Sequence, residues 1–111
     1  MTYQDVASII ASIGLPYAYY QFPEDPANPA PDPPFICFYF SGSNDLLADD
    51  TNYQKIRPLV IELYTDNKDF TIEETVETAL NSAGLVFSRD ETYIDDERMY
   101  MVTYNTEIVI S

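Results

Sequence analysis

Acidic residues are abundant in this chain, and carboxylates are able to take part in catalysis or metal binding. Nineteen Asp and Glu stand against five Lys and Arg in 111 residues, which gives a net charge of −14. They gather at 45–50, 73–77 and 90–97. None of these runs has the alternating spacing and central glycine of a calcium loop, and none pairs two carboxylates with a pocket-forming pattern. We therefore expect solvated loops, turns and a helix N-terminus, with a weak divalent-ion site at 45–50 as the alternative.

The usual residues of nucleophilic catalysis and zinc binding are missing. The chain has no His, three Gly and a single cysteine, Cys37, which lies in the apolar run Phe-Ile-Cys-Phe-Tyr-Phe at 35–40. A catalytic thiol needs a neighbouring base, and a structural zinc site needs four Cys or His ligands. We therefore predict a buried structural thiol, no cofactor, no metal and no enzymatic activity. A small carboxylate-dependent enzyme is the least favoured class.

The net charge also restricts the partners. Binding to phosphates or to anionic lipid requires a basic face, so we expect neither sequence-specific nucleic-acid binding nor membrane docking. No stretch approaches the ~20 apolar residues of a membrane span. Asp5 stands where a signal peptide would carry Lys or Arg. These features predict a soluble protein that is made in the cytoplasm.

Hydrophobic periodicity predicts one domain, 1–111, with the element order α-β-β-β-α-β-β. Apolar residues at helical spacing indicate helices at 2–13 and 72–83, opened by Thr2 with Asp5 and by a capping box at 71–74. Strands are expected at 17–22, 35–41, 57–65, 85–88 continuing after a bulge at 91–94, and 98–110. The expected fold is α+β: a four- to five-stranded, mostly antiparallel sheet with both helices on one face.

Two long connections separate these elements. The first, 23–34, holds six of the eight prolines, so neither a helix nor an inner strand can form there. It is either a long hairpin connection or an arm that reaches a neighbouring subunit. The second, 42–56, is expected to be an acidic, polar loop.

Several predicted strands carry apolar residues on both faces. In the strand 35–41, Phe35, Cys37 and Tyr39 alternate with Ile36, Phe38 and Phe40. Two helices can cover one face of the sheet, with Phe38 and Leu63 beneath them, so a second copy of the chain is expected to cover the other. The candidate interface residues are Tyr17, Tyr19, Tyr20, Pro26, Pro29 and Tyr53.

The layout resembles a known family. A helix leads into a strand and a Pro-rich connection, then PPFICFYFSGS, an acidic loop, RPLVIELYT, a capped helix and a terminal hairpin. Over nearly the whole chain this resembles the tail-terminator (tail-completion) and related neck or minor capsid proteins of long-tailed bacteriophages and prophages. The resemblance implies a non-enzymatic ring, usually of six copies, that ends the tail tube and joins it to the head. It further implies the tail tube protein and head-completion or neck proteins as partners, and the virion as location after assembly in the host cytoplasm.

The acid distribution separates the ring from its competitor, a small acidic inhibitor that mimics DNA. In a ring, Asp45, Asp49 and Asp50 could line a channel that repels DNA. A mimic should concentrate its acids on one surface. The first 54 residues hold seven acids and no base, and the rest hold 12 acids and all five bases, so each part carries −7. This even division favours the structural ring.

Overall fold

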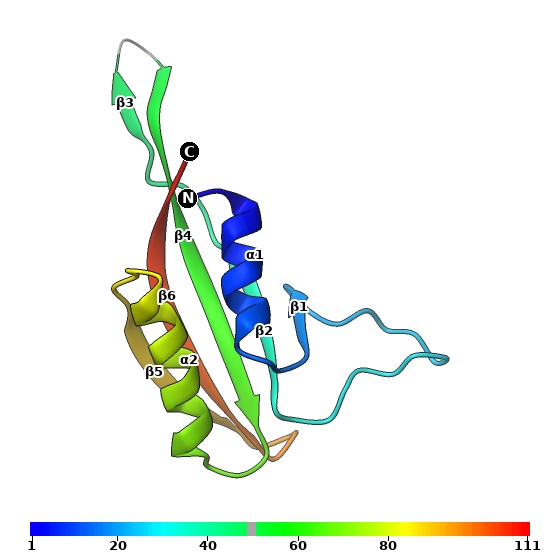
Figure 1. The fold of residues 1–111 in the computed structure, drawn as a ribbon. Coiled ribbons are helices and arrows are strands. Elements are labelled where there is room, and N and C mark those ends of the chain that lie inside the picture. The colour runs from blue at the N-terminus through cyan, green and yellow to red at the C-terminus, as the bar shows by residue number, and fades with distance from the viewer. Residues whose placement is uncertain (49–50) are drawn as a thin grey trace.

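The computed structural model describes residues 1–48 and 51–111, with the side chains of 52 and 53 left out. In this part of the chain, two helices lie on one face of a six-stranded sheet (Figure 1). The strand order is β1-β2-β4-β6-β5, with β3 paired to β4 off this path, and every pair is antiparallel except β1 with β2. The α+β prediction is therefore confirmed. The elements are α1 (Tyr3–Ser12), β1 (Tyr17–Tyr19), β2 (Phe35–Phe40), β3 (Leu46–Ala48), β4 (Thr51–Thr65), α2 (Phe70–Ser82), β5 (Ser88–Ile94) and β6 (Met99–Ile110).

Helix α1 begins as the sequence predicts. The Thr2 backbone N–H donates to Asp5 Oδ2 at 2.8 Å, and the Asp5 N–H donates to Thr2 Oγ1 at 3.0 Å. This reciprocal pair satisfies two of the backbone donors that a helix start leaves open. After the helix, Gly14 takes a φ of +89°, a conformation that glycine adopts at little cost. The apolar stripe of α1 buries Val6 and Ile10 against the sheet.

Helix α2 begins two residues earlier than predicted, and its cap is a different one. Asp69 is the N-cap, and its side chain accepts from the Ile72 N–H at 3.0 Å. The predicted capping box at 71–74 is therefore wrong: Asp is among the strongest N-cap residues, and here it takes that position first. The change leaves Glu73 in the first turn, where it is buried.

The core fills the space between the two helices and the sheet. Strands β2, β4 and β6 place alternate residues on this helix-facing side, and the register sets Leu63 opposite Ile36 on one strand and Val102 on the other. Leu63 is fully buried and Phe38 is 7% exposed. Both lie in the core cluster with residues of α1 and α2, as predicted. No helix in the described residues is long and apolar enough to cross a lipid bilayer.

Two strand predictions need correction. Strand β1 ends at Tyr19, not at 22, because Tyr20 adopts a left-handed φ of 69° that leaves the extended path. Residues 85–87 are not a strand, and β5 runs from Ser88 to Ile94 without the predicted bulge. The sequence hides β5 because three charged residues, 89–91, fall within its first half.

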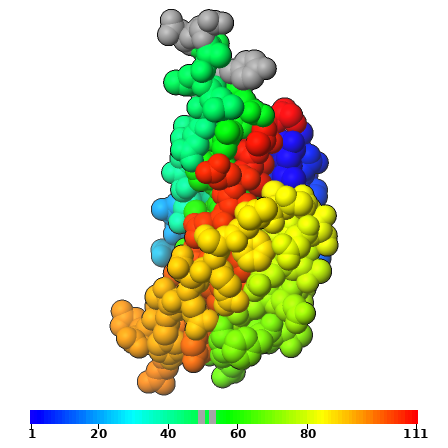
Figure 2. Space-filling model, turned by 90° about the vertical axis from the view of Figure 1, so that its left-hand side faces the viewer, coloured from blue at the N-terminus to red at the C-terminus, as the bar shows by residue number. Residues whose placement is uncertain are grey.

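The largest correction concerns 42–56, which was predicted to be a loop. Strand β3 pairs with the first part of β4, through Leu46 opposite Gln54 and Ala48 opposite Thr51. Residues 46–48 and 51–56 therefore form a two-stranded segment, called here the ribbon, that extends beyond the body (Figures 1 and 2). The segment is too polar to show a strand pattern, but β4 continues through it without a break from the buried half of the sheet.

Candidate subunit interface

The thiol and the carboxylates do not form a reactive site in the described residues. There, no group of three or more His, Cys, Asp or Glu side chains could hold a metal ion. Cys37 is 5% exposed, as predicted, and lies on the sheet face away from the helices. Burial, reinforced by the nearby Glu62 carboxylate, raises the pKa of this thiol to about 11. The thiolate that a nucleophile needs is therefore scarce at neutral pH.

Glu73 departs from the predicted pattern of solvated acids. Its side chain is 2% exposed, and two cations converge on it: Lys68 Nζ lies 2.6 Å from Oε2, and Arg89 Nη2 lies 2.6 Å from Oε1. Arg89 also pairs with Glu77 at 3.0 Å, and Lys68 pairs with Glu91. This ion-pair cluster joins α2 to β5 and to the turn before α2. Lys68 lies in the turn before the helix and Arg89 in the strand after it, and the sequence alone does not distinguish Glu73 from the other acids of α2.

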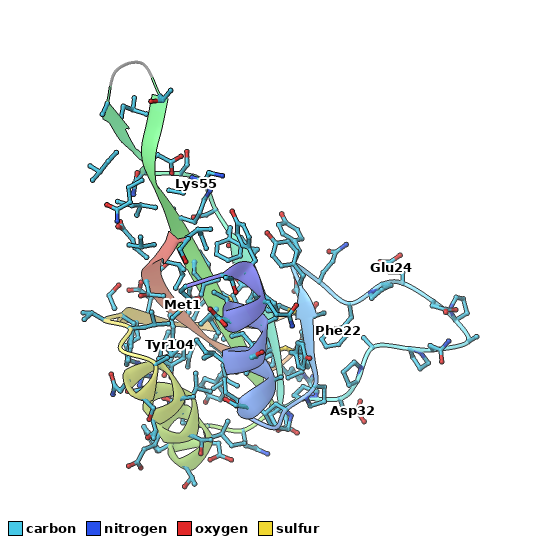
Figure 3. All side chains as sticks on the ribbon, turned by 45° about the horizontal axis from the view of Figure 1, so that its top comes forward. Met1, Phe22, Glu24, Asp32, Lys55 and Tyr104 are labelled. Atoms are coloured by element: carbon cyan, nitrogen blue, oxygen red, sulfur yellow. The ribbon has the colours of Figure 1, made fainter. Side chains whose placement is uncertain are left out.

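Tyr104 links this cluster to the sheet. Its hydroxyl donates to Glu77 Oε2 at 3.0 Å, and the Arg89 guanidinium lies 5.8 Å from its ring centre. The side chain, labelled in Figure 3, is fully buried, and burial together with the bond to Glu77 raises its pKa. The cluster thus links α2, β5 and β6 through paired charges and acts as a structural clamp.

Asp45 also has a partner. Its carboxylate pairs with Arg57 and accepts from the Ile56 N–H at 2.9 Å, and its side chain is 4% exposed. The hydrogen bond that Arg57 donates to Tyr3, and the neighbouring Asp45, raise the pKa of Arg57. Asp45 is thus a compensated charge at the base of the ribbon. Asp49 and Asp50 lie outside the described residues, and a channel-facing role for all three stays a prediction.

The face of the sheet away from the helices is covered only by its own aromatic side chains in the described residues. Phe35 stacks on Tyr64 with ring centres 4.9 Å apart, and Phe22 packs edge-on against Phe35 at 5.3 Å. Tyr20 lies 5.2 Å from the ring of Tyr39. These rings shield one another, but those of β2 and β4 stay half-buried. No helix lies on this side (Figure 1).

These rings border an open groove of about 470 Å³, called here the aromatic groove. Aromatic rings make up much of its walls, and Gln21, Glu62, Glu97 and the tyrosine hydroxyls add polar groups. Such a mixture of aromatic and polar surface is typical of protein contacts, since tyrosine combines a large apolar body with a polar tip. The arrangement suits a protein partner better than a charged small molecule.

The predicted interface tyrosines divide between the two faces of the sheet. Tyr20 lines this groove, whereas Tyr17 and Tyr19 pair in register with core residues of β2 and pack against Phe38 on the helix-facing side. Tyr17, Tyr19 and Tyr20 are 44%, 54% and 62% exposed, and they lie on or next to β1 at the edge of the sheet. Pro26 and Pro29 are exposed on the distal part of the 23–34 loop, which extends away from the body (Figures 1 and 3). The structure thus places the three tyrosines at one edge of the sheet but on different faces, and it sets the prolines apart from them. The side chain of Tyr53 lies outside the described residues.

A second groove was not predicted. Strand β6 continues past Asn105, the last residue that it pairs with β5, and the 84–88 segment folds beside it. The hollow between them, called here the edge groove, measures about 690 Å³ and is lined by Pro58, Leu85, Val86, Phe87, Thr106 and Glu107, among others. Val86 is 88% exposed. The groove arises because β6 extends beyond the end of β5. The predicted strand at 85–88 would have filled this part of the edge, so the groove was not expected.

Comparison with known proteins places the fold. No family model and no curated protein sequence matches the chain. Among solved structures, a chain of the virion of a native gene transfer agent particle is similar, with a TM-score of 0.61 and 15% sequence identity. The match covers 96% of this chain and 90% of that chain. The protein therefore shares its fold with a component of a gene transfer agent virion.

Proposed function

We propose that this protein is a non-enzymatic structural subunit of a phage-type virion. It forms a homo-oligomeric ring, most often of six copies, that ends the tail tube and joins it to the head. The observation that carries the proposal is the sheet face without a helical cover among the described residues, lined by half-buried aromatic rings and bordered by the exposed Tyr20. The fold shared with a component of a gene transfer agent virion supports the same class of particle.

In a ring, a neighbouring subunit would cover the sheet face that carries no helix. In a closed ring each subunit makes two contacts through different surfaces, one with each neighbour. Burying a large apolar side chain contributes roughly 1.5–3 kcal/mol. Covering Tyr20, which is 62% exposed, together with the half-buried Phe35, Tyr39 and Tyr64 can therefore contribute a few kcal/mol per contact. The partners along the axis would be the tail tube protein on one side and head-completion or neck proteins on the other, in the assembled virion.

The oligomeric state tests the proposal. We expect a ring-sized species in sedimentation and in electron micrographs, at high protein concentration or on added tail tubes. Tyr20→Ser should weaken it, whereas Phe70→Ser, at the start of α2 and 72% exposed, should leave it intact. A strict monomer under every condition, tail tubes included, would contradict the ring.

One observation favours the second candidate, a DNA mimic. Residues 62–98 hold 11 of the 19 acids and three of the five bases, a net charge of −8. The β4–α2 and β5–β6 turns, which carry Asp66, Asp69, Asp95, Asp96 and Glu97, meet at one end of the molecule (Figure 1). The net charge is thus divided evenly between the two parts of the sequence, but the acids of these turns gather at one end of the folded molecule. Binding of a monomer to a DNA-binding enzyme, lost on neutralising these acids, would favour the mimic.

A further inference from the structure

The ribbon carries apolar side chains that its own chain does not cover. Leu46 is 51% exposed and Leu47 is 72% exposed. The register shifts between these two residues, and both side chains remain without an apolar cover from the described residues. A two-stranded ribbon without such cover is only marginally stable in water. This segment therefore gains most from a partner.

The edge groove can supply the apolar cover that the ribbon lacks. Pairing with β5 stops at Asn105, and the Met1 backbone bonds to β6 at Val109 and Ser111. Residues 106–108 between these points have no neighbouring strand on that side among the described residues. Thr106 Oγ1 donates to the Val86 carbonyl at 2.6 Å, which holds the exposed Val86 side chain beside this open edge. An open edge next to apolar side chains can accept an added strand.

The geometry prevents a chain from filling its own groove. Strand β4 runs unbroken from the ribbon into the core, so the direction of the ribbon is fixed, and it leads away from the body (Figure 1). In Figure 2, β6 reaches the surface between the 80s segment and the body beneath the ribbon. The ribbon and the edge groove therefore belong to the same molecule, but the ribbon of one copy can enter only the groove of another copy.

We propose that the ribbon of one copy seats in the edge groove of the next copy in the ring, with β3 added along the open edge of β6. The three residues of β3 match the three-residue opening, and Leu46 or Leu47 packs against Val86 and Phe87. The charges of the two surfaces are consistent with the ribbon as the occupant of the groove. Lys55 on the ribbon is exposed and pairs with no carboxylate of the described residues, while Glu107 stands exposed at the groove (Figure 3 labels Lys55).

This inference rests on the proposed ring, and cross-linking between two different variants tests it directly. In a Cys37→Ala background, Leu47→Cys protein is mixed with Val86→Cys protein at a concentration where the wild type forms rings, and the mixture is oxidised mildly. A disulfide between the two variants can arise only between copies. We expect a heterodimer band that exceeds, by about tenfold, the band from Phe70→Cys mixed with Val86→Cys, since Phe70 matches Leu47 in exposure at 72%.

Uncharged substitutions provide the second readout. Leu47→Ser and Val86→Ser should each weaken ring formation about tenfold or more, as expected for a buried aliphatic side chain. Phe70→Ser should not, and all three should keep the monomer's melting temperature. Rings that form normally in both variants, without the specific cross-link, would overturn the ribbon contact and leave the proposed function standing. A wild type that never forms rings would overturn both.

Discussion

Replacing Glu73 by Gln tests the ion-pair cluster that joins α2 to β5. The variant removes the charge on which Lys68 and Arg89 converge, each at 2.6 Å. Removing one partner of a buried pair costs about 3–5 kcal/mol. Lys68 and Arg89 are 22% and 36% exposed and keep contacts with Glu91 and Glu77, so solvent and these acids compensate part of the loss. We expect a decrease of about 2–3 kcal/mol in the free energy of unfolding.

The matched control is Glu74→Gln. Glu74 follows Glu73 in α2 and is exposed, so its variant removes a carboxylate charge from the same helix without disturbing the cluster. The free energy of unfolding of this variant should decrease by no more than about 0.5 kcal/mol. Urea unfolding followed by circular dichroism measures both, and the Glu73 variant should melt roughly 10 °C lower, at about 4 °C per kcal/mol for a domain of this size. Equal losses in the two variants would refute the argument that Glu73 is a buried, paired charge.

Further predictions concern the core, the thiol, the Pro-rich loop and the charge. Phe38→Ala and Leu63→Ala should each cost about 2–5 kcal/mol, and an unchanged melting temperature in both would contradict their place under the helices. Cys37, whose pKa is raised to about 11, should resist alkylation at pH 8 until urea unfolds the chain, whereas rapid labelling of the native protein would show an accessible thiolate. Proteases should cut the 23–34 loop faster in the free subunit than in the ring, and equal resistance would argue against an arm. Added salt should favour the ring, because adjacent subunits of −14 repel each other and screening shortens to about 3 Å at 1 M; stronger sedimentation of rings at low salt would contradict this.

The helix-facing half of the fold could be predicted because its signals are local. The Thr2 and Asp5 pair, the alternation in 57–65 and the apolar stripe of α2 each depend on residues that are close in sequence. The start of α2 was missed because two caps competed within three residues, and Asp69 prevailed. Strand β5 was misplaced because ion pairs, and not apolar residues, occupy its helix-facing positions: Arg89 and Glu91 stand opposite Tyr104 and Val102.

The candidate interface was predictable only in part. The surplus of apolar residues on both faces of 35–41 indicated an uncovered sheet face, and the exposed tyrosines on and next to β1 lie at its edge. Glu73 and Asp45 could not be separated from the solvated acids, because burial of a carboxylate depends on cations that lie 5 to 16 positions away in sequence. The edge groove depends on where two strands end relative to each other, and no window of residues carries that information.

Unequal strand lengths account for both surfaces that the ring contact would use. Strand β4 has 15 residues and β6 has 12, but their neighbours β2 and β5 have six and seven. The helices, of 10 and 13 residues, cover only the part where all four strands run together. The overhang of β4 becomes the ribbon, and the overhang of β6 leaves the open edge. A chain in which β4 began at Lys55 would keep every pair of β4 with β6 and lose most of the ribbon. Deleting 46–54 should therefore preserve cooperative unfolding while abolishing ring formation.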